Sequence, residues 1–215
     1  MGGDLVKPDA VHELETWNLK LETCPMLKDK LILASQSPRR SEILSSVGWP
    51  FEAIPADIDE SRFESEDALS YVLRLAQTKA ETVATRRPSG LVLGADTVVV
   101  VDEEILGQPR DDDDARRMLS LLSGKWHEVV TGIALVRQGE TLQTSVAHQT
   151  TRVRFAELTS EEVEWYVSTG EPKGKAGAYA IQGQGALFIE EIQGDYYNVV
   201  GLPVRLVYEL VRKEK

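Results

Sequence analysis

Apolar runs alternate with amphipathic periods along most of the chain, and this order predicts its secondary structure. The run LVLGADTVVVV at residues 91–101 is the strongest strand former, because β-branched residues fill it. Shorter apolar or alternating runs bounded by turn residues also favour strands. The predicted strands cover residues 31–35, 51–55, 91–101, 129–136, 144–155, 186–192 and 197–200.

Helical periodicity fills most intervals between these strands. Ser37 and Pro38 have the residue types of an N-cap and a first helical position, and Gly48 is a typical end signal. Thr159, with Glu162 three residues later, matches a capping box. Strands and helices in alternation predict an α/β fold. The predicted helices cover residues 37–48, 66–86, 111–124 and 159–170, and a last one starts at Pro203.

Composition narrows the class of protein. With 215 residues, of which 42% are hydrophobic, the chain can bury the core of one domain, or of one domain with two lobes. The net charge of -11 argues against a nucleic-acid-coating or membrane-surface protein, since both present a broad basic face. One cysteine and three histidines exclude an internal disulfide and a clustered zinc site. No apolar run approaches the roughly 20 residues that span a bilayer, so we expect a soluble, cytoplasmic protein.

Residues 1–28 differ from the rest of the chain. Val11, Leu14, Trp17 and Leu21 are spaced for one face of a short amphipathic helix. We expect an appended segment of unknown role. A helix that packs on the body, or a loosely ordered tail, is the ordinary alternative.

Arg39 and Arg40 directly follow the start of the first predicted helix. The N-terminal end of a helix carries partial positive charge and unpaired N–H donors, so two cations there are unfavourable without an anion opposite. With the hydroxyls of Ser35 and Ser37 beside them, the two guanidinium groups suit a phosphate, which arginine binds in a bidentate manner. The alternative is that both arginines pair with a nearby acid such as Glu42.

Two lysines are further candidates for contacts with an anion. Lys79 lies on the apolar stripe of its predicted helix, where it either extends to water or reaches a ligand across a cleft. Lys175 lies in the glycine-rich stretch PKGKAGAYAIQGQG, whose backbone can approach a ligand closely. Such loops are also ordinary connectors, so neither lysine alone identifies a site.

Asp96 is an acid inside the otherwise apolar strand 91–101. A carboxylate there is costly unless it meets a cation, a metal ion or a proton-transfer task, and a hydrogen-bonded aspartate at a β-bulge is the alternative. Glu60 in ADIDE is a second candidate, although most loop acids are simply solvated. The acidic run 111–114 fits the charge preference of a helix N-terminus better than a metal site. Acids, arginines and lysines in one cleft would suit phosphoryl chemistry with a divalent ion.

Eight sequence blocks, in this order and spacing, resemble the Maf family of nucleoside triphosphate pyrophosphatases. They run from about Leu31 to the end of the chain: ASQSPRRSEIL, DIDE, LRLAQTKA, LGADTVV, LGQPRD, SGKWHEVVTG, GEPKGKAGAYAIQG and NVVGLPV. The resemblance implies a mixed-sheet α/β fold like that of the inosine triphosphate pyrophosphatases, an elongated domain with two lobes around a deep substrate groove. It assigns residues 29–215 to this domain and implies a homodimer.

The resemblance also implies the chemistry and the residues that carry it. Water cleaves a nucleoside triphosphate between its α- and β-phosphates, with Mg²⁺ or Mn²⁺ as cofactor. By position, Asp96 is the proton acceptor for the attacking water, and Glu60 is a second acid that shares the metal ion with Asp96. The residues that match the phosphate-holding set of the family are Ser35, Arg39, Arg40, Lys79 and Lys175.

Three positions resemble the family members that act on dTTP and UTP rather than on 7-methyl-GTP: Arg39, Thr97 and Gln182. A glutamine amide offers both a donor and an acceptor, which suits the O4/N3 edge that uracil and thymine share. We therefore expect a dTTP/UTP pyrophosphatase that clears or sanitises nucleotides. The family also suggests a link to cell-division arrest.

Two positions depart from the family pattern. Gln108 stands where relatives commonly carry lysine, which removes one cationic contact, and Ala180 replaces the usual glycine of YGIQG. The alternatives are a pyrophosphatase for other or modified nucleotides, such as 7-methyl-GTP, and a nucleotide-binding regulator without turnover. Retention of Asp96, Glu60 and Lys79 argues against the regulator, whereas Gln108 favours it.

Overall fold

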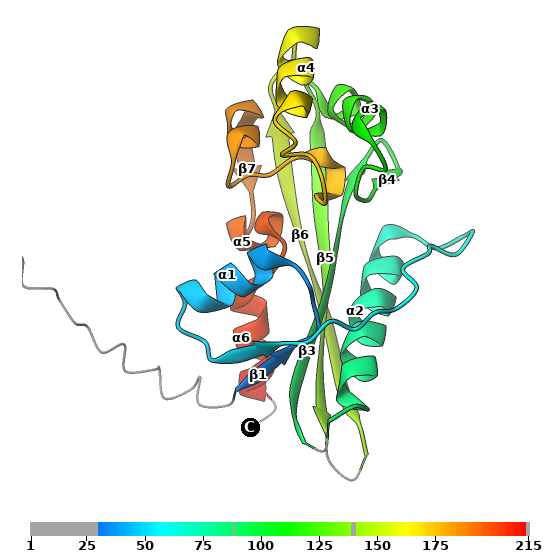
Figure 1. Cartoon of the computed structure of the whole chain (residues 1–215), viewed down its shortest axis with the longest axis vertical. Coiled ribbons are helices and arrows are strands. Elements are labelled where there is room, and N and C mark those ends of the chain that lie inside the picture. The colour runs from blue at the N-terminus through cyan, green and yellow to red at the C-terminus, as the bar shows by residue number, and fades with distance from the viewer. Residues whose placement is uncertain (1–29, 88, 139–140, 214–215) are drawn as a thin grey trace, which may run out of the picture.

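Three long strands pair antiparallel and run along most of the length of the molecule (Figure 1). The structure, a computed structural model, describes residues 30–87, 89–138 and 141–213. Within these ranges seven strands form one mixed sheet in the order β2-β1-β3-β5-β6-β7, with β4 paired to β3. The strands are β1 (Leu31–Leu33), β2 (Phe51–Ala53), β3 (Gly90–Val101), β4 (Glu104–Leu106), β5 (Trp126–Gln138), β6 (Gln143–Phe155) and β7 (Ile189–Gln193).

Helices cover this sheet largely where the sequence predicts them. They are α1 (Pro38–Ser46), α2 (Ala68–Ala84), α3 (Asp112–Leu122), α4 (Ser160–Ser168), α5 (Tyr196–Val200) and α6 (Val204–Lys213), with short 3₁₀ turns η2 (Ala176–Ala178) and η3 (Gln184–Phe188). The capping box of Thr159 and Glu162 is present at the start of α4. Together with the mixed sheet, these helices confirm the predicted α/β class.

Two predicted strands are wrong in whole or in part. Residues 197–200 form the helix α5, because the Asp195 side chain accepts hydrogen bonds from the backbone N–H groups of Tyr197 and Asn198 and caps a helical turn. The strand predicted at residues 186–192 begins only at Ile189, since η3 precedes it. The three-residue strand β4 has no counterpart in the prediction.

The molecule has two lobes, one toward each end of the long strands (Figure 1), and each lobe encloses buried side chains. At the end of the sheet with β1 and β2, Leu91 and Leu93 pack in a cluster with residues of α1 and α6, whereas Val92 faces α2. At the other end, α3 and α4 enclose a second core that includes Phe155 and Tyr166. Because β3 and β5 run through both lobes, the architecture is the elongated, two-lobed one that was predicted.

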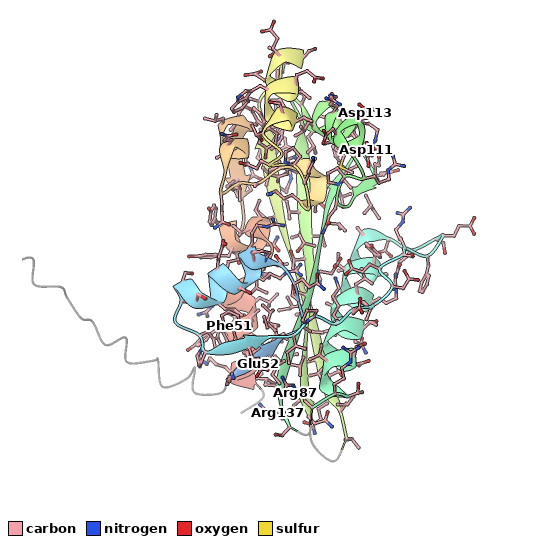
Figure 2. All side chains as sticks on the ribbon, viewed as in Figure 1. Phe51, Glu52, Arg87, Asp111, Asp113 and Arg137 are labelled. Carbon is pink, nitrogen blue, oxygen red and sulfur yellow. The ribbon has the colours of Figure 1, made fainter. Side chains whose placement is uncertain are left out.

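The acidic run belongs to the second lobe. Figure 2 shows Asp111 and Asp113 at the start of α3, at the opposite end of the molecule from Glu52 and Arg87. Asp111 is the N-cap and accepts a hydrogen bond from the backbone N–H of Asp114. The run therefore complements a helix N-terminus, as expected.

Close packing of α2 on the sheet prepares the site. A Cβ added at Gly94 of β3 would collide with the backbone carbonyl of Ala76 in α2, so only glycine allows this approach. As a result Lys79, three residues after Ala76, is only 8% exposed and faces β3. Among the described residues, no helix has the length and apolarity needed to cross a membrane.

Candidate active site

A cavity lies where β1 ends and β3 continues. β1 pairs in parallel with β3 only as far as Leu93, so Asp96 and Thr97 follow at the level where the chain leaves β1 toward α1. The carboxyl ends of parallel strands are the usual place for ligands in α/β sheets. The cavity has a volume of about 500 Å³ and is lined from both lobes.

This cavity collects the whole set of site residues that the sequence predicts. They are Ser35, Arg39, Arg40, Glu60, Lys79, Asp96, Thr97, Lys175 and Gln182. Four of them are cations, in a chain whose net charge is -11. The structure therefore places a local group of positive charges in an acidic protein, whereas the individual roles stay predictions.

Arg40 is buried and held on three sides by the protein. Its Nε donates to the carbonyl of Gly201 (2.9 Å), its Nη1 to the hydroxyl of Ser35 (3.1 Å) and its Nη2 to the hydroxyl of Thr97 (3.2 Å). The Thr97 hydroxyl in turn lies 3.0 Å from that of Thr131. Burial lowers the pKa of Arg40, while the nearby Asp96 carboxylate opposes this shift. The guanidinium group is thus fixed in orientation before any ligand binds.

Arg39 faces the cavity from the same helix start. Its Nη2 donates to the carbonyl of Gly174 in the opposite lobe (3.1 Å). In the part of the chain that the structure describes, Arg39 and Arg40 bond to backbone carbonyls and form no ion pair with Glu42, although Glu42 is close enough to raise the pKa of Arg39 against the larger effect of burial. The alternative of two surface ion pairs is therefore wrong. The first turn of α1 holds no acid, so its partial positive charge also faces the cavity uncompensated.

Lys79 joins the two candidate acids. Its Nζ lies 2.7 Å from Oδ1 of Asp96 and 2.8 Å from Oε1 of Glu60. Lys79 therefore reaches across the cleft and does not extend to water. Asp96 pairs with Gly132 in a β3–β5 ladder without a register shift, so the alternative of an aspartate at a β-bulge is also wrong.

The environment of Asp96 suits a proton acceptor. Burial raises the pKa of its carboxyl group, and the positive charges of Lys79 and Arg40 oppose this effect. A raised pKa makes a carboxylate a stronger base, and the two cations favour its ionised form. The side chain is only 8% exposed, so a proton that it accepts is shielded from bulk water.

The residues on the second lobe's side of the cavity are more exposed. Lys175 is half-buried, and its pKa is lowered first by burial and then by the positive charge of Arg39. Gln182 is exposed at the cavity wall, in the turn before η3. Gln108 also lines the cavity. These side chains can contact a ligand without first breaking a buried hydrogen bond.

Comparison with known proteins decides the family. Residues 30–214 match the family described as Maf-like protein. The chain belongs to the Maf family. The dTTP/UTP pyrophosphatase of Symbiobacterium thermophilum is 52% identical over 182 residues, covering 85% of this chain and 92% of that protein. The dTTP/UTP pyrophosphatase of Anaeromyxobacter dehalogenans (strain 2CP-1) is 51% identical over 185 residues, covering 86% and 93%.

Solved structures with a similar outline are more distant from this Maf chain. The Staphylococcus aureus Ham1 protein shares 14% sequence identity at a TM-score of 0.48, covering 86% of this chain and 100% of that one. A HAM1 protein from Coxiella burnetii shares 12% identity at a TM-score of 0.47, covering 86% and 98%.

The two carboxylates that line this Maf cavity fit a divalent cation whose remaining ligands come from water and the substrate. Glu60 and Asp96 contact the same ammonium group, so their oxygens face one space. Among the described residues, no group of three or more His, Cys, Asp or Glu side chains is arranged to hold a metal ion. Mg²⁺ characteristically takes one or two carboxylates and completes its octahedron with water and substrate phosphates. Two acids in a cavity that four cationic side chains also line match that pattern.

Both departures from the Maf pattern line the cavity, and one of them changes its charge. Gln108 lines it, so the loss of a lysine there removes a positive charge from the ligand's surroundings. Ala180 lacks the positive φ that would demand glycine, and its backbone N–H donates to the Tyr166 hydroxyl (3.1 Å). Alanine at this position is therefore accommodated.

Sequence reasoning missed the residues that hold the Maf site in place. Thr131 supports Thr97 across the β3–β5 ladder. Tyr71 donates to the backbone carbonyl of Glu60 (2.7 Å), and Arg74 donates to the carbonyl of Ser61 in the same loop (3.0 Å). The strand register and the contacts of the helix α2 reveal these roles, whereas residue type alone does not.

Proposed function

We propose that this protein hydrolyses dTTP and UTP to the nucleoside monophosphate and pyrophosphate, and thereby clears or sanitises nucleotides. The observation that carries the proposal is the contact of Lys79 with Asp96 and Glu60 beside the fixed guanidinium group of Arg40. The names of the relatives at 52% and 51% identity support the choice of substrates.

The triphosphate lies against the cationic side of the cavity. The backbone N–H groups at the start of α1 and the Ser35 hydroxyl donate to phosphate oxygens. Arg39 exchanges its contact with the Gly174 carbonyl for a phosphate, and Lys175 approaches from the other lobe. Arg40 contributes mainly its fixed charge, because the protein already uses three of its donor positions.

Asp96 then accepts a proton from the attacking water. The water oxygen forms a bond to the α-phosphorus, and the bond from that phosphorus to the bridging oxygen breaks. Pyrophosphate leaves with the electron pair, and the proton of the water passes to the Asp96 carboxylate. Lys79 holds Asp96 in place through Oδ1 and keeps Glu60 beside it.

Glu60 and Asp96 are the residues that would hold a divalent cation, Mg²⁺ or Mn²⁺. When bound, it neutralises charge that builds up on the phosphate oxygens and the leaving group. Glu60 is suited to this role because its side chain is 54% exposed and can turn from Lys79 to a cation without leaving the cavity.

Gln182 recognises the base. Its amide can donate to O4 and accept from the N3–H of uracil or thymine, a pattern that cytosine reverses. Arg39 and Thr97, the other two positions expected to set specificity, line the same cavity. Because Gln182 stands on the second lobe, the base lies toward that lobe, while most contacts to the phosphates come from the side of α1.

A pyrophosphate-release assay tests the proposal. The full chain is given UTP, dTTP, CTP, ATP, GTP and 7-methyl-GTP with Mg²⁺ or Mn²⁺, and we expect UTP and dTTP to react fastest. Asp96→Asn should lower kcat for UTP about 10³-fold, because an amide cannot accept the proton. The control Asp102→Asn changes an exposed acid that pairs with Lys125 and should leave the rate unchanged.

Two results of this assay contradict the proposal. Tight binding of UTP without turnover identifies a nucleotide-binding regulator. Equal rates on purine and pyrimidine nucleotides remove the substrate choice but leave the hydrolysis.

The assembly and its location are also proposals. Residues 29–215 act as one catalytic domain, which the family match over residues 30–214 supports. The domain forms a homodimer and works in the cytoplasm, in keeping with one cysteine and a net charge of -11. Light scattering of the purified chain at its working concentration tests the dimer, since a monomeric mass contradicts it.

A further inference from the structure

The turn that carries Gln182 is built around one carboxylate. Glu171, which follows α4, accepts hydrogen bonds from the backbone N–H of Gln184 (3.0 Å) and of Gly185 (3.1 Å). Both donors belong to the start of η3, directly after Gln182 and Gly183. A single side chain therefore satisfies two consecutive donors of the turn.

Tyr166 holds the other end of the same turn. Its hydroxyl donates to Oε1 of Glu171 (2.7 Å) and accepts from the backbone N–H of Ala180 (3.1 Å). Burial raises the pKa of Tyr166, so its hydroxyl stays protonated and remains a donor. Glu171 and Tyr166 together fix the backbone on both sides of Gln182.

The fit between the acid and the turn is close. A Cβ added at Gly183 would collide with the carboxylate of Glu171, so the turn can approach the acid only with glycine there. Burial raises the pKa of Glu171, but the hydrogen bonds from Gln184, Gly185 and Tyr166, with the charge of Lys175, together lower it below its ordinary value. Glu171 is therefore ionised near neutral pH and able to accept every bond that the turn offers.

Glu171 also lies within electrostatic reach of the phosphate side. Its charge raises the pKa of Lys175, against the lowering caused by burial and by Arg39. Glu171 therefore bonds to the turn that carries Gln182 and interacts electrostatically with Lys175. Both of these residues line the cavity on the side of the second lobe.

We propose that Glu171 is a positioning residue for base selection: it sets the orientation of the Gln182 amide and through it the preference for uracil over cytosine. This inference rests on the proposed function. Glu171 touches the turn rather than the base, so its effect falls on discrimination between nucleotides that differ only at the O4/N3 edge.

The isosteric change Glu171→Gln tests the inference. A glutamine has one acceptor oxygen and places an NH₂ donor against a backbone N–H or the Tyr166 hydroxyl, so it cannot accept all three bonds. We expect the ratio of kcat/KM for UTP to that for CTP to fall about tenfold, through a higher KM for UTP. Inhibition by inorganic pyrophosphate, which carries no base, should change less than about threefold.

Two further variants separate positioning from general support. Glu164→Gln removes an acid of α4 that pairs with Arg116 on the surface, and it should keep the wild-type UTP/CTP ratio. Tyr166→Phe keeps the ring but loses the bonds to Glu171 and Ala180, and it should lower the ratio in the same direction. If Glu171→Gln lowers kcat/KM equally for UTP and CTP, or leaves the ratio unchanged, the inference is wrong.

Failure of the proposed function gives a different result. If the wild-type chain releases no pyrophosphate, calorimetric binding of UTP and CTP replaces the kinetic ratio. A UTP preference in binding that Glu171→Gln removes supports the inference without turnover. An unchanged preference, or none in the wild type, overturns it.

Discussion

The two sides of the cavity are built in different ways. On the first lobe's side, Arg40, Lys79 and Asp96 are each less than 10% exposed and bonded to protein groups. On the second lobe's side, Gln182 and Gln108 are exposed, and Glu171 holds the backbone of the turn that carries Gln182. Buried charges that bond to one another are costly to rearrange. The side with Arg40, Lys79 and Asp96, called the reaction side below, is therefore preorganised by the sheet. The side with Gln182, called the base side, depends on the shape of a turn.

The largest effect should follow from breaking the reaction side. Lys79→Met removes the cation that Asp96 and Glu60 share, so the two carboxylates lose the ammonium group between them and repel each other. We expect kcat/KM for UTP to fall about 10³-fold. The control Lys125→Met removes a surface lysine paired with Asp102 and should leave kcat/KM within about twofold.

The same variant predicts a change in pH dependence. Asp96 must be ionised to accept a proton, and Lys79 lowers the pKa that burial raises. Without Lys79 the pKa of Asp96 rises further, so the acid limb of kcat/KM should move to higher pH by about one unit or more. An unchanged acid limb assigns the limiting ionisation to another group.

A smaller and more selective effect should follow on the base side. Gln182→Ala removes the amide from the cavity wall but leaves the buried cluster untouched. We expect the UTP/CTP ratio of kcat/KM to fall between about tenfold and a hundredfold, because two neutral hydrogen bonds are lost. Gln184→Ala, in the same turn, is the matched control: its backbone N–H and not its side chain contacts Glu171. A uniform loss on all nucleotides would show that both sides act as one unit.

The smallest effect should come from restoring a charge. Gln108→Lys adds a cation to the cavity lining, so KM for UTP at low salt should fall between about threefold and tenfold. Gln143→Lys, an exposed position on β6, makes the same change in net charge outside the cavity. If both variants lower KM equally, long-range attraction and not a local contact explains the effect.

Much of the fold could be predicted because its long elements repeat one signal. β3 and α2 follow from a β-branched run and an apolar stripe that local sequence displays in full. The helix α5 was missed because Tyr197, Val199 and Val200 are residue types that favour strands, whereas a single cap at Asp195 decides the conformation. The short β4 exists only through its pairing with β3, which no local pattern shows.

The site residues also divide into those that local sequence can indicate and those whose role depends on contacts between distant parts of the chain. Arg39 and Arg40 could be singled out as candidate anion contacts because their charge conflicts with their position in α1. That Asp96, Glu60 and Lys79 meet required the family resemblance, since their contact depends on how closely α2 packs against Gly94. Thr131 and Glu171 could not be found from sequence, because they act through a neighbour in space and not through an unusual residue type.

The position of the attacked phosphorus tests the central claim most directly. A single turnover of UTP in water enriched in ¹⁸O, followed by mass spectrometry of both products, reports which phosphorus the oxygen joins. If Asp96 activates water next to the α-phosphate, the label appears in UMP and the pyrophosphate stays unlabelled. Label in pyrophosphate or in inorganic phosphate contradicts the account.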